Sequence, residues 1–212
     1  MLRILFVLVG YVFGLFQTGH IYGKLVHRDL HKEGSGNTGA TNALRVLGVK
    51  GGLIVFFFDA LKAFIPCFIV KMIFKDDPLK YVYLMYTAIG VTLGNDYPFF
   101  LKFKGGKGVA ACFGWFLALD WRMALLGISL FFILAFSTRY VSISSMCAAL
   151  FVVILTPIFR HFGWLVVESH FAELMILICI AQLILIIRHA ENIKRLIHGT
   201  ENRFGSKKKK TE

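Results

Sequence analysis

The sequence predicts an all-α membrane protein, a polytopic helical bundle of about seven transmembrane helices. Of its 212 residues, 57% are hydrophobic and only 17% are charged, whereas a soluble domain has roughly a quarter of its residues charged. The apolar residues gather into runs close to the length of one membrane-spanning helix, about 20 residues. The lysines and arginines concentrate in alternate connections between these runs, as expected of a chain that crosses the membrane repeatedly.

The apolar runs define the expected helices in order. They cover approximately residues 2–22, 52–74, 80–100, 107–119, 123–138, 141–159 and 172–187. Several runs are short or contain glycine, so five or six crossings remain alternatives to seven. The first run begins like a signal peptide with Arg3, but no small-residue cleavage site follows it, and we expect it to be retained as a span.

The positive charges predict the orientation of the bundle. With the N-terminus outside, four segments face the cytoplasm and contain more than two thirds of the 24 lysines and arginines: 23–50, 101–107, 138–140 and 188–212. Lys and Arg close to the ends of spans favour the cytoplasmic side. The C-terminus is therefore predicted to be cytoplasmic.

We expect one integral-membrane domain over residues 1–206, followed by a basic, disordered tail at 207–212. The tail carries four consecutive lysines, which either lie against the anionic inner leaflet or remain solvated. The formal net charge of +12 is also compatible with nucleic acid. Nucleic-acid binding needs a soluble face on which basic and aromatic residues interleave, and the sequence offers none, so we expect no nucleic-acid partner.

Two charged residues fall inside the second apolar run. Asp59 and Lys62 are three positions apart and so share one face of a helix. Charges at membrane depth are costly and mark either a buried pair or a functional site; we favour a structural pair and keep substrate contact as the alternative. The cysteines lack C-x-x-C spacing and each fall in a separate apolar run, which is typical of small packing residues: Cys67, Cys112, Cys147 and Cys179.

The first predicted cytoplasmic segment contains a glycine-rich stretch, residues 34–45. It reads Gly-Ser-Gly-Asn-Thr-Gly-Ala-Thr-Asn-Ala-Leu-Arg. Its glycines permit close approach of a ligand, and Ser35 and Asn37 are among its short polar side chains. Arg45 adds a planar guanidinium group, whose N–H donors can bind two oxygens of one phosphate at once. We predict an anion site formed with backbone N–H groups at the start of a helix, with an ordinary flexible loop as the alternative.

A second glycine-rich loop, residues 102–108, reads Lys-Phe-Lys-Gly-Gly-Lys-Gly. It lacks the spacing of a Walker A loop. The adjacent Gly105 and Gly106 would bring backbone amides beside the ammonium group of Lys107, and we expect Lys107 to contact a ligand. The two earlier lysines of the loop are more typical of a membrane surface.

Two further polar groups complete the predicted cytoplasmic side. His189 and Asn192 share one face if the last span continues as a helix; His189 would then bind phosphate or move a proton, or else be only interfacial. Ser142 and Ser145 share a helix face near Arg139, and they either extend the same site or merely join two helices. No paired carboxylates or metal-ligand set is evident, so we expect positioning and electrostatic stabilisation to carry the chemistry.

In these segments the chain resembles the bacterial acyl-phosphate:glycerol-3-phosphate acyltransferases. The likeness spans nearly the whole chain and rests on stretches that occur in the family's order: Gly34-Ser35-Gly36-Asn37 through Arg45, Lys104-Gly105-Gly106-Lys107-Gly108-Val109-Ala110, Arg139-Tyr140-Val141-Ser142, and Arg188-His189 through Asn192, ending in Gly199-Thr200-Glu201. Each stretch alone is weakly diagnostic, and together they are specific.

The resemblance implies transfer of a fatty acyl group from acyl phosphate to the 1-hydroxyl of sn-glycerol 3-phosphate. The products would be 1-acylglycerol 3-phosphate (lysophosphatidic acid) and phosphate, in phospholipid biosynthesis. It also implies seven helices in the bacterial inner membrane, an active site that faces the cytoplasm, and no metal or cofactor. The implied partners are the two substrates, membrane lipid and the soluble enzyme that makes acyl phosphate.

Position in these stretches and residue type together give the expected site. The expected catalytic residues are Ser35, Lys107, His189 and Asn192. The expected substrate- and phosphate-binding residues are Asn37, Arg45, Gly105, Gly106, Arg139, Ser142 and Ser145.

Three positions depart from the pattern of this family. Asn95 stands where the family has His, Ala111 where it has Thr, and Ala63 where it has Gly. The change at Asn95 removes a candidate base or phosphate ligand. A phosphate group of either substrate can accept the hydroxyl proton instead. We therefore expect substrate-assisted proton removal, with His189 mainly orienting the substrate.

Other classes of membrane protein fit the sequence less well. A transporter or channel would place more ionisable groups at the midplane and show inverted halves. A transferase with a polyprenyl or nucleotide-activated donor would need clustered Asp for divalent metal ions. The sequence shows none of these features, and a non-catalytic scaffold would leave the anion-binding loops without a role.

Overall fold

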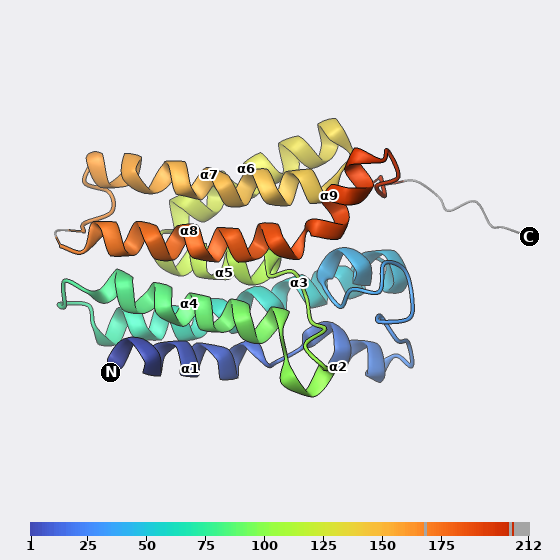
Figure 1. Cartoon of the computed structure of the whole chain (residues 1–212), viewed down its shortest axis with the longest axis horizontal. Helices are drawn as coiled ribbons and strands as arrows, with labels where there is room; N and C mark the ends of the chain where they lie inside the picture. The colour runs from blue at the N-terminus through green and yellow to red at the C-terminus, as the bar shows by residue number, and fades with distance from the viewer. Residues whose placement is uncertain (168, 204, 206–212) are drawn as a thin grey trace, which may run out of the picture.

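A computed structural model gives the fold of residues 1–167, 169–203 and 205. Within these residues the regular elements are all helical: α1 (Leu2–Gly14), α2 (Thr18–Leu25), α3 (Ala40–Ile73), α4 (Lys80–Asp96), the short 3₁₀ helix η1 (Phe99–Leu101), α5 (Val109–Leu119), α6 (Trp121–Thr138), α7 (Val141–His161), α8 (Phe171–Arg188) and α9 (Ala190–Ile197). The long helices run side by side along one axis; α1 begins at one end of the bundle, and α2 and α9 lie at the other (Figure 1). The basic tail predicted at 207–212 lies outside the described residues.

Every predicted apolar run contains a helix, but the helices differ in their ability to span a bilayer. In the part of the chain that the structure describes, five segments are long and apolar enough: residues 2–25, α3, α6, α7 and α8. Helix α4 has 17 residues, and the apolar α5 has only 11. The number of seven crossings and the side that faces the cytoplasm therefore stay predictions.

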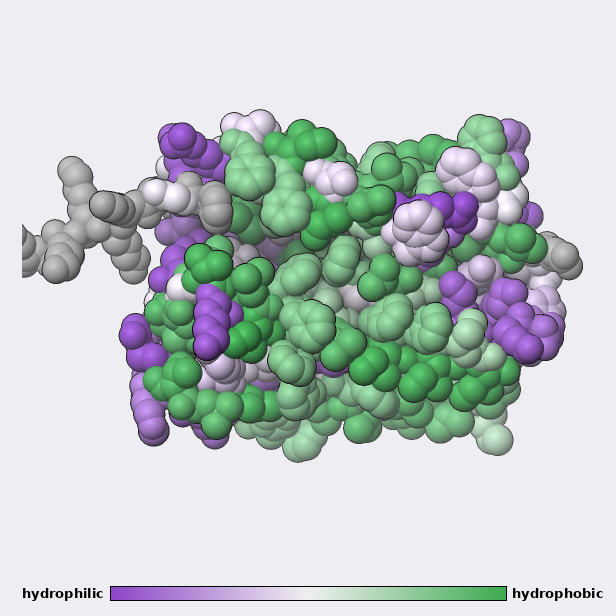
Figure 2. Space-filling model, turned by 180° about the vertical axis from the view of Figure 1, so that it is seen from behind, coloured by the Kyte–Doolittle hydropathy of each residue, from purple (hydrophilic) through white to green (hydrophobic). Residues whose placement is uncertain are grey.

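The surface of the bundle is that of a protein surrounded by lipid. Hydrophobic side chains cover the middle of the visible face, and hydrophilic side chains gather toward its two ends (Figure 2). Large apolar residues are exposed on the lateral surface, including Ile133 on α6, which is 65% exposed, and Leu8 on α1, which is 58% exposed. Contiguous exposed apolar surface of this extent marks contact with a membrane.

Helices α1 and α4 approach each other closely because glycines lie at their contact. A Cβ atom added at Gly10 or at Gly94 would lie 2.1 or 2.2 Å from a backbone oxygen of the opposite helix. Small residues at such contacts let membrane helices pack backbone against backbone. The first apolar run is therefore an integral part of the bundle.

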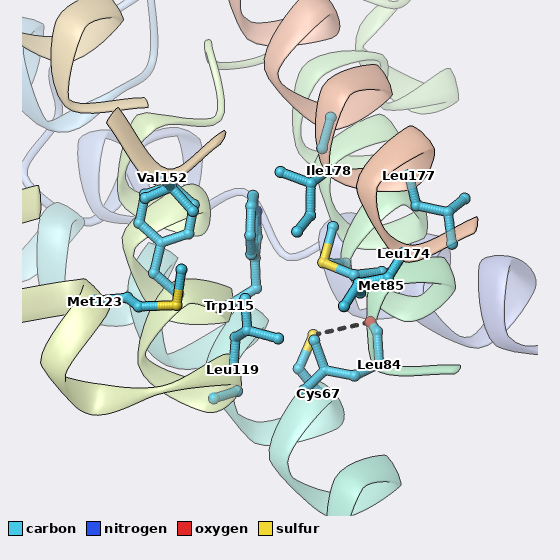
Figure 3. Close-up of a cluster of buried hydrophobic side chains, with 14 of the residues drawn as sticks. Cys67, Leu84, Met85, Trp115, Leu119, Met123, Val152, Leu174, Leu177 and Ile178 are labelled. Atoms are coloured by element: carbon cyan, nitrogen blue, oxygen red, sulfur yellow. Dashed lines mark hydrogen bonds between the residues drawn. The ribbon is translucent and has the colours of Figure 1, made fainter. Parts of the chain in front are cut away.

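Helix α5 lies in the core of the bundle. Its Trp115 is 1% exposed and belongs to one buried cluster with Met85 of α4, Val152 of α7 and Ile178 of α8 (Figure 3). Most of its side chains are buried, although Leu117 is 36% exposed. A helix that is covered by protein over most of its surface need not match the thickness of the bilayer. This position accounts for an apolar helix too short to span the membrane alone.

The four cysteines do not share one environment. Cys67 and Cys112 are buried, as expected of packing residues, and the Sγ atom of Cys67 lies 3.8 Å from the carbonyl oxygen of Leu84. Cys147 and Cys179 are exposed on the surface of the bundle, so they do not pack inside the chain as the sequence suggested. Apolar runs are exposed to lipid on one face, which is why the run alone did not separate the two pairs.

Helix α3 begins at Ala40, well before the apolar run predicted from residue 52. Gly48 interrupts it with φ 76° and ψ −172°, in a region that favours glycine, so a short first helix and a long second helix meet at an angle. The short part carries Arg45. Because its residues are mixed in polarity, hydropathy did not reveal it.

Candidate active site

A cavity of about 720 Å³ opens between α3, α5, α6, α7 and the junction of α8 with α9. One end is polar and basic, and the rest is apolar. The polar end is lined by Ser35, Asn37, Thr41, Arg45, Gly106, Lys107, Ser142, Ser145, His189, Asn192, Arg195 and Glu201. The apolar part is lined mainly by side chains of α3 and α6. Among these, Leu53 and Phe136 are 63% and 68% exposed, so the cavity opens sideways between the two helices.

The structure brings together all but two of the predicted site residues. The two that do not line the cavity are Gly105 and Arg139. Arg139 is exposed at the C-terminal end of α6, where it has a positive φ of 61°. Helix α7 begins at Val141, and its first turn places Ser142 at the cavity. Arg139 is close to Ser142 in the sequence, but it lies in the connection before α7 and does not reach the cavity.

Asn42 holds the first glycine-rich stretch in shape. Its side chain is buried, and its Oδ1 accepts a hydrogen bond of 2.8 Å from the backbone N–H of Ser35. Its Nδ2 donates to the carbonyl oxygens of Leu30 and Glu33 at 3.1 and 3.0 Å. Asn42 is therefore a scaffold that positions Ser35, and it leaves the serine side chain at the wall of the cavity.

Gly105 and Gly106 serve close packing and do not offer their amides to a ligand. The N–H of Gly105 donates to the carbonyl of Asp96 at 3.2 Å, and the N–H of Gly106 donates to that of Asn95 at 3.0 Å. A Cβ atom at Gly105 would lie 2.1 Å from the carbonyl oxygen of Asn95. The expectation that these amides would bind an anion beside Lys107 is thus wrong, because the loop lies directly against the end of α4.

Arg188 fixes the same loop from the other side. Its guanidinium donates to the carbonyl oxygen of Gly106 from Nε at 3.1 Å and from a terminal nitrogen at 2.8 Å, and also reaches Gly105 at 3.2 Å. It lies over the ring of Tyr97, 4.9 Å from the centroid. Sequence reasoning gave Arg188 no role beyond its place in a family stretch, yet its guanidinium fixes the loop from which Lys107 enters the cavity.

Lys107 is a half-buried cation at the polar end of the cavity. Its Nζ donates a hydrogen bond to Oδ1 of Asn192. Burial lowers the pKa of Lys107 to about 8, and the charges of Arg195, Arg188 and Arg45 add to this effect while Glu201 opposes it. The site therefore carries a surplus of positive charge, which is the electrostatic setting for a phosphate ligand.

His189 is buried and neutral at physiological pH. Its Nδ1 lies 2.8 Å from the carbonyl oxygen of Leu185. A carbonyl only accepts, so Nδ1 carries the proton and Nε2 is left as an acceptor. Burial lowers the pKa of His189 to about 4, with smaller contributions from Lys107 and Arg188. Burial is thus the main reason that the imidazole is neutral, and the two neighbouring cations act in the same direction.

Glu201 is a site residue to which sequence reasoning assigned no role. Its Oε1 accepts hydrogen bonds from Asn192 at 2.7 Å and from Ser142 at 3.0 Å, and its Oε2 accepts one from Arg195 at 2.6 Å. Burial alone would raise the pKa of Glu201, but these hydrogen bonds bring it below its ordinary value. The available signal was an acidic residue one turn beyond a basic amphipathic helix.

Helix N-termini add partial positive charge to the polar end. The first turns of α3, α5 and α7 all line the cavity. Helix α5 starts immediately after Gly108, whose φ of 73° turns the chain, and the next residues to line the cavity are Val109 and Ala110. The unpaired N–H groups of such a first turn attract anions.

Asp59 and Lys62 form the structural pair that the sequence favoured. Nζ of Lys62 lies 2.7 Å from each of three oxygens: Oδ1 of Asp59, Oδ1 of Asn95 and the carbonyl of Phe16 at the break between α1 and α2. An ammonium group has three donors, and all three are used. Asn95, which departs from the family pattern, is thus a partner of Lys62, although it also lines the cavity.

The described residues contain no group of three or more His, Cys, Asp or Glu side chains placed to hold a metal ion. The expectation of chemistry without a metal stays an expectation.

Comparison with known proteins decides the family. The family model described as glycerol-3-phosphate acyltransferase matches residues 4–199. This chain belongs to the glycerol-3-phosphate acyltransferase family. Relatives from Thermotoga petrophila and Aquifex aeolicus, both called glycerol-3-phosphate acyltransferase, are 38% and 37% identical to it. These alignments cover 94% and 93% of this chain and 95% and 97% of the relatives.

Solved structures of this acyltransferase family have the same fold. The chain is similar to the glycerol 3-phosphate form of PlsY (YgiH), an integral membrane glycerol 3-phosphate acyltransferase, with a TM-score of 0.84, 35% identity and 96% coverage of both chains. The lysophosphatidic acid form of PlsY gives a TM-score of 0.82 at 34% identity, with 96% and 95% coverage. The expected family and the helical membrane class are thereby confirmed.

Proposed function

We propose that this acyltransferase moves a fatty acyl group from acyl phosphate to the 1-hydroxyl of sn-glycerol 3-phosphate, and so makes 1-acylglycerol 3-phosphate and phosphate. The observation that carries the proposal is the cavity itself, in which a cationic polar end continues into an apolar part. The polar end suits a small, doubly charged phosphate ester. The apolar part suits a fatty acyl chain, because burial of each methylene contributes about 0.8 kcal/mol.

The basic side chains at the polar end give each phosphate a partner. Arg45 offers a planar fork for bidentate hydrogen bonds, and Lys107 offers a point charge. Ser35 and Asn37 lie along the same wall, and the first turn of α5 faces the cavity with them. These groups are suited to hold glycerol 3-phosphate and the phosphate of the donor side by side, which is the positioning that the reaction requires.

The proposed reaction needs no covalent intermediate. The 1-hydroxyl oxygen bonds to the acyl carbon, the bond from that carbon to the phosphate oxygen breaks, and its electron pair leaves with the phosphate. The hydroxyl proton passes to a phosphate oxygen held nearby. This assignment is supported by His189, because a pKa of about 4 is far from the neutral range in which a general base works well. The Nε2 atom of His189 is then free to orient the acceptor by accepting a hydrogen bond from its 2-hydroxyl, which leaves the proton of the 1-hydroxyl to the phosphate.

The donor and the product are tested directly with purified protein. We would supply glycerol 3-phosphate with palmitoyl phosphate, or with palmitoyl-CoA in a parallel arm, and measure lysophosphatidic acid and released phosphate. Equal amounts of both products with palmitoyl phosphate, and no product with the thioester, are expected. Turnover of palmitoyl-CoA at the same rate or faster would refute acyl phosphate as the donor.

The cytoplasmic direction of the site is part of the same proposal. The polar end of the cavity lies at the end of the bundle where α2 and α9 are found (Figure 1). That end also carries the lysine- and arginine-rich segments 23–50 and 188–203. The positive-inside tendency favours the cytoplasm for it, where glycerol 3-phosphate would enter from water.

A further inference from the structure

The apolar part of the cavity ends at Gly127 of α6. We propose that this glycine sets the longest acyl chain that the enzyme accepts, with the ring of Phe116 as the wall that faces it. The inference rests on the proposed function, because it assigns the apolar part of the cavity to the fatty acyl chain of donor and product.

Helix α6 contributes one continuous strip to the cavity. From the polar end inward it consists of Phe136, Ala135, Phe132, Phe131, Ile128 and Gly127. The next residues on this face, Ala124 and Met123, are fully buried and do not line the cavity. Met123 belongs to the buried cluster around Trp115 (Figure 3). The cavity therefore follows α6 for about 16 Å from its end at Thr138 and then meets solid core.

The packing around Gly127 does not require a glycine. At Gly10, Gly94 and Gly114, an added Cβ atom would lie 2.1, 2.2 and 2.0 Å from a backbone oxygen of another helix, so a larger residue cannot fit there. At Gly127 the nearest atoms to an added Cβ are two ring carbons of Phe116, at 3.8 and 4.0 Å, which is ordinary contact. Glycine is also less favourable than alanine inside a helix. The space that a side chain at 127 would fill is the cavity itself.

The wall opposite Gly127 is fixed. Phe116 is 4% exposed, and its ring meets that of Trp115 edge to face with centroids 4.2 Å apart. Ala149 of α7, also buried, lines the same cavity. A longer side chain at position 127 cannot push this wall back, so it shortens the space available to the chain.

A larger side chain at position 127 should affect long acyl chains and not short ones. Long and short acyl chains make the same contacts near the polar end, and only the long chain reaches Gly127. Gly127→Leu therefore removes contacts of the terminal methylenes of a palmitoyl chain and leaves those of an octanoyl chain intact. Gly127→Ala, which adds one methyl group, has an intermediate effect.

The first experiment measures kcat/KM with palmitoyl phosphate and octanoyl phosphate for the wild type, Gly127→Ala and Gly127→Leu. The matched control is Leu126→Phe, which adds bulk on the exposed side of α6, outside the cavity. We expect the palmitoyl-to-octanoyl ratio to fall at least tenfold in Gly127→Leu and to stay within about twofold in the control. An unchanged ratio, or an equal loss with both donors, would overturn the inference.

A second experiment separates this inference from the identity of the donor. The thermal stabilisation of each variant by palmitoyl and by octanoyl lysophosphatidic acid reports chain binding without turnover. Gly127→Leu should lose the stabilisation by the palmitoyl product and keep that by the octanoyl product. If wild type does not turn over acyl phosphate, the proposed donor fails, and the product-binding result still decides the role of Gly127. Equal stabilisation of Gly127→Leu and wild type by the palmitoyl product would count against it.

Discussion

Nζ of Lys107 donates a hydrogen bond to Oδ1 of Asn192, and this contact joins the loop before α5 to α9 across the polar end of the cavity. The other side of the Asn192 amide donates to Glu201 at 2.7 Å. Asn192 thus lies between a half-buried cation and a half-buried anion. The protonation and the direction of the Lys107 side chain therefore depend on residues that lie about 90 positions later in the chain, Asn192 and Glu201. The consequences can be measured.

Activity should depend on the charge of Lys107. The protonated ammonium attracts phosphate, and burial lowers the pKa of this group to about 8, so kcat/KM should fall as the pH rises through about 8. Lys107→Arg keeps its charge over the whole range. The alkaline limb should disappear in that variant whatever its rate, as shown by profiles between about pH 6 and 10. A limb that persists unchanged in Lys107→Arg would assign it to another group.

Arg45→Lys tests the planar fork. Lysine keeps the charge but loses bidentate geometry, and we predict at least a tenfold loss in kcat/KM, about 1.4 kcal/mol of transition-state binding. The matched control is Lys50→Ala, which removes an exposed cation that follows the break at Gly48 and does not line the cavity. Near-normal activity of Arg45→Lys, or an equal loss in the control, would contradict a specific role for the fork.

His189 should act as a hydrogen-bonding group and not as the base. His189→Asn and His189→Gln keep a polar side chain but cannot take a proton near neutral pH, so they should retain far more activity than His189→Ala. The comparison needs purified, folded protein between about pH 6 and 9. Equal and nearly complete loss in all three variants, with a wild-type limb at the titration of the imidazole, would make His189 the base.

Glu201→Gln should shift the pH profile of another residue. The carboxylate raises the pKa of Lys107 by its charge and orients Asn192 and Arg195. Without that charge, the alkaline limb of kcat/KM should move to lower pH than in wild type, with a loss in rate of about tenfold at pH 7. A rate loss without movement of the limb would indicate a purely structural role for Glu201.

Topology can be mapped with single cysteines. Lys32→Cys lies in a predicted cytoplasmic segment, and Lys75→Cys lies in a predicted outside loop; both residues are exposed. In intact cells an impermeant thiol reagent should label Lys75→Cys and leave Lys32→Cys unlabelled. The parent protein gives the background from the native exposed cysteines, Cys147 and Cys179. The reverse labelling pattern would invert the orientation.

Hydropathy and charge were sufficient for the class of fold and the position of most helices, because lipid selects long apolar segments whatever their partners. The same signal did not reveal the short helix that carries Arg45, which is mixed in polarity and ends at Gly48. Only the glycine-rich stretch at 34–45 indicated that a helix starts there. Hydropathy and charge also did not separate α5, whose side chains are mostly buried, from the helices that face lipid over a larger part of their surface. Both features depend on tertiary packing, which leaves little trace in local composition.

The sequence was sufficient to predict those site residues whose role follows from their residue type. Arg45, Lys107 and His189 were expected, and all line one cavity. The roles of Gly105 and Glu201 were not foreseen, because they follow from contacts with segments distant in sequence. A glycine that permits an anion to approach and a glycine that permits α4 to approach look the same in the sequence.

The lateral opening between α3 and α6 has a consequence for kinetics. A substrate that enters through exposed Leu53 and Phe136 comes from the plane of the bilayer and never passes through bulk water. Its effective concentration is then its mole fraction in the membrane or detergent micelle. Added detergent at constant amounts of enzyme and acyl donor should slow the reaction by surface dilution, while the dependence on the water-soluble acceptor should still follow its concentration per litre.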